Sequence, residues 1–291
     1  MKVRIVPRLD IKGPNLVKGI HFEGLRVLGK PEAFARDYYE HGADELIYMD
    51  AVASLYGRNS LLDIVERTSR EIFIPLTVGG GLRSLDDIRS ALRAGADKVS
   101  LNTAAIARPE LISEASRAFG ASTIVVSIEA LQRADGSYEA YVNYGRDSTG
   151  VDAFEWAVRA AELGAGEIMV TSVNREGTGK GFDIGLTRRI ADSVPIPVIA
   201  GGGAGSAAHV HDVVARGHVN AVAIASLFHY NGMRHFEASN HDANVEGNVE
   251  FLRRGIGTKR FEDASIGTVK AHLTGLGIEC RHREEAIADA Q

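Results

Sequence analysis

A repeated segment constrains the fold of this chain more than any other feature of its sequence. The string IPLTVGGG at residues 74–81 returns as IPVIAGGG at residues 196–203, an offset of 122 residues. The same offset aligns HGADEL with LGAGEI, so that Glu45 corresponds to Glu167. Each copy contains a strand pattern, a glycine turn and a helix pattern. The chain is therefore predicted to form one domain with two similar halves, about 1–122 and 123–291.

Strand and helix patterns alternate eight times. Near-continuous apolar strands separated by amphipathic helices are typical of a parallel sheet covered on its faces. Eight units and the half-chain repeat favour a single closed (β/α)₈ TIM barrel; the alternative α/β fold is an open doubly wound sheet. Strands are expected near 3–9, 44–50, 73–78, 96–101, 123–128, 166–171, 196–200 and 219–225. Helices are expected near 31–42, 60–70, 84–94, 108–118, 152–163, 184–193, 206–216 and 268–276.

Composition excludes several classes of function. The chain has 291 residues, of which 45% are hydrophobic, enough for one large core. Its formal net charge of −5 argues against a nucleic-acid partner, because binding a phosphate backbone relies on basic patches. No apolar run approaches the roughly 18 residues that span a bilayer. The first residues carry no signal-peptide pattern, and a single cysteine, Cys280, suits a reducing compartment, so we expect a cytoplasmic location.

One segment interrupts the alternation. Residues 231–265 separate the eighth strand from the last helix, and a connection of that length is usually functional or disordered. It leaves the carboxyl end of a strand, which is the face where barrel active sites lie. We expect a long insertion there that forms a lid or a substrate contact over the barrel mouth, the alternative being a solvated insertion without a role in catalysis.

Polar residues and glycines follow the predicted strands. A barrel would bring these positions to one mouth although they are far apart in sequence. Glycine turns let backbone N–H groups approach a phosphate, and the next helix N-terminus adds a favourable dipole. The two turns therefore predict a ligand with a phosphate at either end, the alternative being tight turns without a ligand. The candidate phosphate-binding residues are Gly79, Gly80, Gly81, Asn102, Thr103, Gly201, Gly202, Gly203 and Ser226.

Two carboxylates follow opposite strands. Asp10 ends the first predicted strand and Glu129 the fifth, so they would face each other across an eight-stranded barrel. Such a pair suits general acid–base catalysis, although either group could instead cap a loop or pair with a lysine such as Lys18. Further candidates for substrate binding are Lys18, Asp50, Glu176, Gly177 and Thr178; the last three lie in a glycine-rich loop where turn contacts are the alternative.

Four charged residues lie near the starts of strands, at the opposite end of the predicted barrel. They are Arg4, Glu45, Lys98 and Glu167, two cations and two anions that could close a ring. By composition alone, an ordinary plug of salt bridges is the favoured interpretation.

Histidine is frequent in the second half, but the spacing does not predict a metal site. The histidines lack the paired spacing with cysteine or other ligands that zinc sites show, so we interpret them as surface or packing residues. We expect neither a metal nor a cofactor. The residues concerned are His209, His211, His218, His229, His235 and His241.

Several strings together resemble the cyclase subunit of imidazole glycerol phosphate synthase, the HisF family. The resemblance runs from residue 1 to about 228 and resumes over the last helix to about 281. The strings that carry it are RLDIKG, LVKGIHFEGLR, ADELIYMD, FIPLTVGGGLRS, AGADKVSLNTAA, GAGEIMVTSVNREGT and IPVIAGGGAG.

The resemblance implies an activity, a partner and residue roles. In that family a ribulosyl intermediate with two phosphates reacts with ammonia and yields imidazole glycerol phosphate and an aminoimidazole carboxamide ribotide. A glutaminase subunit (HisH-like), docked on the N-terminal face of the barrel, supplies the ammonia through a charged gate. By this resemblance Asp10 and Glu129 are the acid–base pair, the two glycine turns bind the phosphates, and the four charged residues form the gate. Asp97 matches a residue of the glutaminase contact.

The chain also departs from the family pattern. Arg8 stands where the family has a cysteine, Glu129 where it has an aspartate, and Leu131 where it has a lysine. Asn174 and Glu176 replace two aspartates, and the insertion has no counterpart. Phosphate binding and ammonia delivery are expected to be intact, whereas the groups near the reacting centre are altered. The resemblance leaves two alternatives open: a paralogue that delivers ammonia to another phosphorylated or nucleotide-linked substrate in surface-sugar or secondary metabolism, and a non-catalytic barrel that regulates the glutaminase.

Overall fold

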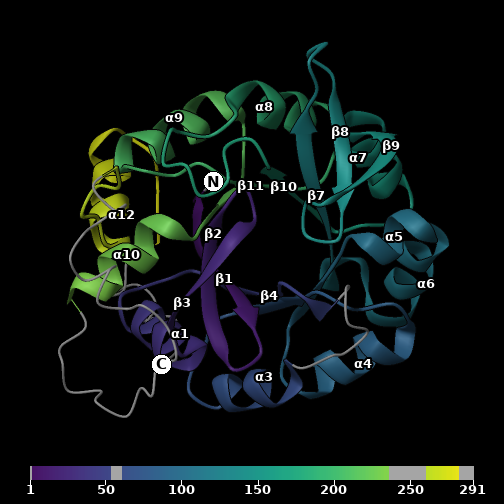
Figure 1. Cartoon of the computed structure of the whole chain (residues 1–291), viewed down its shortest axis with the longest axis horizontal. Coiled ribbons are helices and arrows are strands. Elements are labelled where there is room, and N and C mark those ends of the chain that lie inside the picture. The colour runs from purple at the N-terminus through teal and green to yellow at the C-terminus, as the bar shows by residue number, and fades with distance from the viewer. Residues whose placement is uncertain (1, 54–60, 236–259, 282–291) are drawn as a thin grey trace.

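The computed structural model describes residues 2–53, 61–235 and 260–281, and within them eight parallel strands close into a barrel (Figure 1). The fifth barrel strand pairs with the sixth in parallel register, with Glu129 opposite Thr171, so each barrel strand has a neighbour on both sides. The predicted barrel is thereby confirmed, and the open sheet is wrong. In order around the barrel the strands are β1 (Arg4–Lys12), β4 (Leu46–Asp50), β5 (Leu76–Gly79), β6 (Lys98–Leu101), β7 (Ile124–Gln132), β10 (Glu167–Ser172), β11 (Val198–Gly201) and β12 (Ala221–Ile224).

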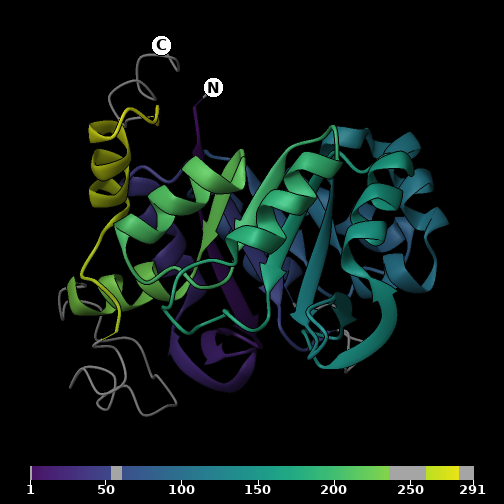
Figure 2. The ribbon, with the colours of Figure 1, turned by 90° about the horizontal axis from the view of Figure 1, so that it is seen from above.

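Helices surround the barrel, as Figures 1 and 2 show. Each of the eight predicted helices is present in the described residues, with its ends displaced by a few residues at most. They are α1 (Pro31–Glu40), α3 (Leu62–Ser69), α4 (Leu85–Arg93), α6 (Glu110–Phe119), α7 (Ala153–Glu162), α8 (Ile184–Ser193), α9 (Ala207–Gly217) and α12 (Ile266–Gly275). Shorter or additional helices are α5 (Thr103–Ala107), η1 (Ala121–Thr123) and α10 (Ser226–His235).

Alternation along the barrel strands produces two apolar cores. Outward-facing side chains such as Ile5 and Leu9 are fully buried against the helices. Inward-facing side chains fill the barrel interior between its two ends. This inner cluster consists of Val6, Ile47, Met49, Val125, Met169, Ile199, Ala221 and Ala223. The barrel interior is therefore packed with apolar side chains, as expected for a closed barrel of eight strands.

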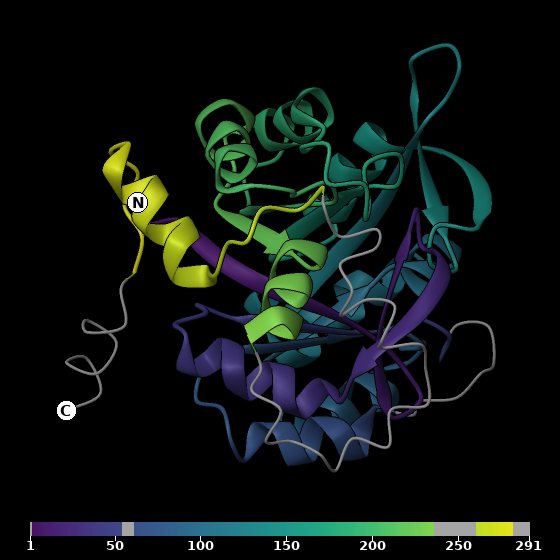
Figure 3. The same ribbon diagram turned by 60° about the vertical axis from the view of Figure 1, so that its left-hand side comes forward.

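Two antiparallel hairpins were not predicted from the sequence. β2 (Asn15–Ile20) and β3 (Glu23–Gly29) continue the sheet from β1, and β8 (Tyr138–Val142) and β9 (Asp147–Asp152) continue it from β7. Figures 2 and 3 show both hairpins at the end of the barrel away from the N-terminus. The hairpins extend the strands that carry Asp10 and Glu129 and border the barrel mouth. Because each half of the chain contributes one such hairpin, the two-fold repeat includes the hairpins.

The structure corrects the boundary of the insertion. Residues 231–235 are not part of a loop, because they complete α10, which begins directly after the last barrel strand. The returning segment packs against the barrel mouth: the Glu262 N–H donates to the Gly205 carbonyl at 2.8 Å, and Phe261 is buried. The remainder of the expected insertion, residues 236–259, lies outside the described residues, so the lid expectation stays a prediction.

Candidate functional site

The two predicted catalytic carboxylates lie buried at the carboxyl ends of opposite barrel strands. Asp10 is on β1 and Glu129 on β7, the first and fifth strands in barrel order. Both side chains are almost inaccessible, with exposed fractions of 0% and 2%. Ionised carboxylates at such burial require compensating partners. The partners differ for the two residues, and so do the consequences for their pKa values.

Asp10 is held between two cations. Arg8 Nε donates to Asp10 Oδ1 at 3.0 Å, and Lys18 Nζ donates to Asp10 Oδ2 at 3.1 Å. Burial alone would raise the pKa of Asp10, but Arg8 and Lys18 outweigh it and lower that pKa to about 2. Lys18 also pairs with Glu176. Asp10 is consequently a carboxylate at every pH at which the protein would work.

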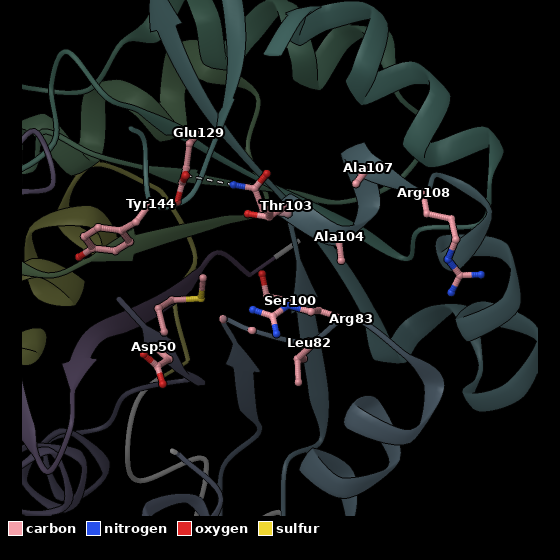
Figure 4. Close-up of a pocket in the computed structure, with 14 residues that line it drawn as sticks. Asp50, Leu82, Arg83, Ser100, Thr103, Ala104, Ala107, Arg108, Glu129 and Tyr144 are labelled. Atoms are coloured by element: carbon pink, nitrogen blue, oxygen red, sulfur yellow. Dashed lines mark hydrogen bonds between the residues drawn. The ribbon is translucent and has the colours of Figure 1, made fainter. Parts of the chain in front are cut away.

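Glu129 has weaker compensation. Its Oε2 accepts hydrogen bonds from Asn102 Nδ2 at 3.0 Å (Figure 4) and from the Gly145 N–H at 2.7 Å. Burial raises the pKa of Glu129 to about 7, although the charge of Arg8 and the Gly145 N–H oppose the rise. A carboxyl group with a pKa near neutrality can exchange a proton during a reaction. The two acids therefore differ in charge state near pH 7.

The first glycine turn borders an open cavity of about 310 Å³ (Figure 4). Gly80 has a φ of +96°, and a Cβ there would lie 2.6 Å from the Asp50 carbonyl oxygen, so this position requires glycine. Asn102, Thr103 and Glu129 reach the same space from β6, α5 and β7. The helix behind the turn, α4, begins with a capping box formed by Ser84 and Asp87. We call this space the first cradle.

The second glycine turn borders a much smaller space. Its cavity of about 10 Å³ is lined by Gly202, Gly203 and Ser226, and on the other side by Arg8 and Glu176. Gly202 has a φ of +86°, and a Cβ there would lie 2.8 Å from the Ser172 carbonyl oxygen. Ser226 begins α10, so the first turn of this helix faces the space. We call it the second cradle. The repeat predicted two similar cradles, and the structure shows two of unequal volume.

The remaining candidate residues divide into lining and turn residues. Asp50 borders the first cradle, but its Oδ1 accepts the N–H groups of Val52 and Ala53 at 2.9 and 2.8 Å. Gly177 lines the second cradle, and Gly79 and Gly201 end their strands just below the two turns. Thr178 donates its hydroxyl to the Arg175 carbonyl at 2.7 Å, which is the turn contact that the sequence left as an alternative.

The charged ring is present at the other end of the barrel. Arg4 Nη1 lies 2.7 Å from Glu45 Oε1, and Arg4 also pairs with Glu167. Lys98 Nζ lies 3.0 Å from Glu45 Oε2 and 3.1 Å from Glu167 Oε2. The four side chains thus alternate in charge around a closed circuit, below the apolar interior.

The sequence missed several residues that border the mouth. Tyr144, from the turn between β8 and β9, lines the first cradle and packs on Phe22 with ring centroids 4.4 Å apart. Arg83 and Arg108 border the same cavity (Figure 4). Arg83 follows the glycine turn by two residues, which is a signal that could have identified it. Tyr144 had no such signal, because the hairpin that positions it was not predicted.

The fold and the mouth define the class of this protein: it is a (β/α)₈-barrel protein with a candidate site at the carboxyl ends of the strands. Residues 4–234 match the family model described as histidine biosynthesis protein. The chain is 56% identical over 203 residues to imidazole glycerol phosphate synthase subunit HisF of Legionella pneumophila, which covers 70% of this chain and 96% of that protein. It is 48% identical over 228 residues to the subunit of the same name from Alkaliphilus metalliredigens (strain QYMF), which covers 78% of this chain and 90% of that protein.

The chain belongs to the HisF family of histidine biosynthesis proteins. The resemblance stated from the sequence is confirmed. The family match ends within α10, so the segment that follows this helix lies outside it. Among the described residues, no group of three or more His, Cys, Asp or Glu side chains is placed to hold a metal ion. The helices in the described ranges also include none that is long and apolar enough to cross a membrane.

Proposed function

We propose that this chain is the ammonia-using cyclase subunit of imidazole glycerol phosphate synthase. It would convert a bisphosphorylated ribulosyl aminoimidazole carboxamide intermediate and ammonia into imidazole glycerol phosphate and aminoimidazole carboxamide ribotide. The family membership carries this proposal, together with the two cradles and the acid pair at the mouth. Both relatives are named imidazole glycerol phosphate synthase subunit HisF. The alternative, delivery of ammonia to a substrate of surface-sugar or secondary metabolism, is therefore not favoured. The retained and buried Asp10 argues against a barrel that only regulates a glutaminase.

The barrel order explains how such a substrate would be positioned. The first cradle follows β5 and β6, the third and fourth strands, and the second follows β11 and β12, the seventh and eighth. A ligand with phosphates in both cradles therefore spans the mouth. Asp10 and Glu129 lie on the first and fifth strands, which face each other across the barrel. The line between these two residues therefore crosses the line between the two cradles. The carbon and nitrogen atoms between the two phosphates would consequently lie between the two carboxyl groups.

The different charge states of Asp10 and Glu129 suggest which of them acts as the general base and which as the general acid. Asp10, ionised through Arg8 and Lys18, would orient the substrate and accept a proton. Glu129, which holds a proton up to about pH 7, would donate one to the leaving or cyclising group. Glu129 replaces the aspartate of the family, and its carboxyl group extends about one methylene further into the mouth. We propose that the hydrogen bonds from Asn102 and Gly145 orient the Glu129 carboxyl group for this role.

The lower half of the barrel suggests a route for ammonia. The ring of Arg4, Glu45, Lys98 and Glu167 closes the N-terminal end, and the inner apolar cluster fills the space between the ring and the mouth. An apolar interior favours neutral ammonia over ammonium, because an unpaired charge is costly to bury. The route would also keep the reactive intermediate away from bulk water.

A glutaminase partner on the N-terminal face is part of the proposal. The relatives are named as subunits, which implies assembly with another chain. Phe73 precedes β5 on this face and is 78% exposed. Asp97 lies on the same face, where its carboxylate accepts the Leu76 N–H at 2.8 Å. We propose that these residues border the contact with the glutaminase.

Complementation tests the proposed function. Expression of this chain in a histidine auxotroph that lacks the cyclase subunit should restore growth without histidine, provided that a compatible glutaminase or a high ammonium concentration is present. In vitro, the purified chain should consume the ribulosyl intermediate with ammonium and form both products. Failure of both assays with folded protein would reject the proposal. Glutamine hydrolysis by the isolated chain would reject the separate glutaminase partner.

A further inference from the structure

Arg8 is a buried arginine at the position where the HisF family has a cysteine. It lies on β1 and points into the barrel, two residues before Asp10, and only 3% of its surface is exposed. Two of its nitrogens are bound: Nε donates to Asp10 at 3.0 Å, and Nη1 donates to Thr171 Oγ1 at 3.1 Å. The third nitrogen, Nη2, is buried without a hydrogen-bond partner among the described residues.

The second cradle lies directly beside this side chain. Arg8 lines the cavity together with Gly202, Gly203 and Ser226. A glycine turn and the first turn of a helix supply backbone N–H groups that suit a phosphate. A guanidinium group is the side chain that binds phosphate best, because it presents several donors in one plane. The cavity thus combines a glycine turn and a helix start with a buried guanidinium group.

Of the two buried cations that contact Asp10, Arg8 is the one that lines the second cradle and keeps a donor without a hydrogen-bond partner among the described residues. Lys18 is bound to both Asp10 and Glu176, so its ammonium group compensates these carboxylates. The Glu176 carboxylate lies at the rim of the cavity, and its Oε2 is 3.3 Å from the position of a Cβ on Gly202. A phosphate that enters must therefore overcome one negative charge. A buried guanidinium donor without a partner offsets that repulsion and gains a hydrogen bond.

We propose that Arg8 is a substrate-contacting residue, whose Nη2 donates to a phosphate monoester bound in the second cradle. The proposal deepens the proposed function, since it assigns one phosphate of the intermediate to this arginine. The cavity of about 10 Å³ holds no more than one water-sized molecule, so the Glu176 carboxylate moves aside when the phosphate enters.

A phosphate titration tests this without relying on turnover. Inorganic phosphate is added to the full chain, and backbone amide shifts are followed by NMR at Gly203 and Ser226 for the second cradle and at Gly81 and Thr103 for the first. Arg8→Cys should weaken phosphate binding at the second cradle by roughly 10-fold or more, as expected for a hydrogen bond between charged groups. Binding at the first cradle should change by less than about 3-fold, since each cradle binds its own phosphate.

Arg175→Cys is the matched control. Arg175 is a half-buried arginine of the adjacent loop that does not line the cavity. Its Cβ, which lies 3.1 Å from the position of a Cβ on Gly203, is kept in cysteine, and the substitution removes the same charge. It should leave phosphate affinity at the second cradle within about 3-fold of the original chain. Equal losses in Arg8→Cys and Arg175→Cys would show a general effect of charge and overturn the proposal, as would unchanged binding in Arg8→Cys.

A second variant covers the case in which Arg8→Cys does not fold. Arg8→Lys keeps the positive charge but offers no planar fork, so it should bind phosphate at the second cradle more weakly than the original chain and retain the fold. With the ribulosyl intermediate, the same variant should raise KM more than it lowers kcat. If the chain binds phosphate through Arg8 but does not turn over the intermediate, the proposed reaction fails while the Arg8 assignment stands. If turnover is normal and KM is unchanged in Arg8→Lys and Arg8→Cys, the assignment fails alone.

Discussion

Replacement of Glu129 by glutamine should stabilise the protein at alkaline pH. Burial raises the pKa of Glu129 from 4.5 to about 7, so the folded chain keeps a proton that the unfolded chain releases. The protonated group contributes stability that is fully present below about pH 4.5 and is lost as the pH rises through 7. Integrated over this range, the ionised Glu129 costs about 3 kcal/mol at pH 9. Because the side chain is only 2% exposed, solvent screening reduces this figure little.

Glu129→Gln keeps an oxygen that can accept from Asn102 and Gly145, but it never becomes charged. We therefore expect the free energy of unfolding, measured with urea and followed by circular dichroism, to exceed that of the original chain by up to about 3 kcal/mol at pH 9 and to differ little at pH 5. A stability difference that is the same at both pH values would refute the burial argument.

Glu139→Gln, on the neighbouring strand β8, is the control. Burial opposes ionisation of Glu139, but hydrogen bonds from Ser148 and Gly150 outweigh it and lower its pKa to about 2. This residue is ionised in the folded and the unfolded chain throughout the range from pH 5 to 9. Its substitution should therefore destabilise the protein by the same amount at both pH values.

Four further predictions concern activity and packing. Asp10→Asn should lower kcat by roughly 10²- to 10⁴-fold while KM changes little, because the cradles hold the ligand; an unchanged kcat would exclude Asp10 from proton transfer. In the original chain kcat/KM should decline above about pH 7 as Glu129 ionises, and this limb should be absent in Glu129→Gln. Lys98→Met opens the charged ring, so more glutamate should form per product with the glutaminase present, whereas ammonium-dependent turnover should persist; tight coupling in this variant would argue against a gate. Glu262→Ala removes an acceptor of the Ala207 N–H (2.8 Å) at the start of α9 and should cost about 1 kcal/mol in urea unfolding, and a neutral result would mean that this segment does not stabilise the second cradle.

The order of the strands and the opposition of the key side chains could be predicted from the sequence. The spacing of apolar residues indicates where strands and helices form, and the 122-residue repeat shows that the same units recur. When eight such strand–helix units close into a barrel, the strands follow one another around the axis in sequence order. Asp10 and Glu129 follow the first and fifth strands, so their opposition is a consequence of counting strands. The closed charged ring follows in the same way, because Arg4 and Glu45 begin two strands that are neighbours in the barrel. The helix ends could be predicted nearly as well, since each predicted helix ends within a few residues of the observed one.

Only the tertiary structure decided what the side chains at the mouth do. Arg8 has no local signal, since its importance comes from Thr171, Asp10 and the second glycine turn, which approach it from three separate parts of the chain. The protonation of Glu129 depends on complete desolvation and on how few cations remain near it, and both are properties of the packed barrel. The two glycine turns are almost identical in sequence, yet the first borders an open cavity and the second is nearly filled. Short-range conformation is encoded by neighbouring residues, whereas burial, charge compensation and free volume arise from contacts between residues that only folding brings together.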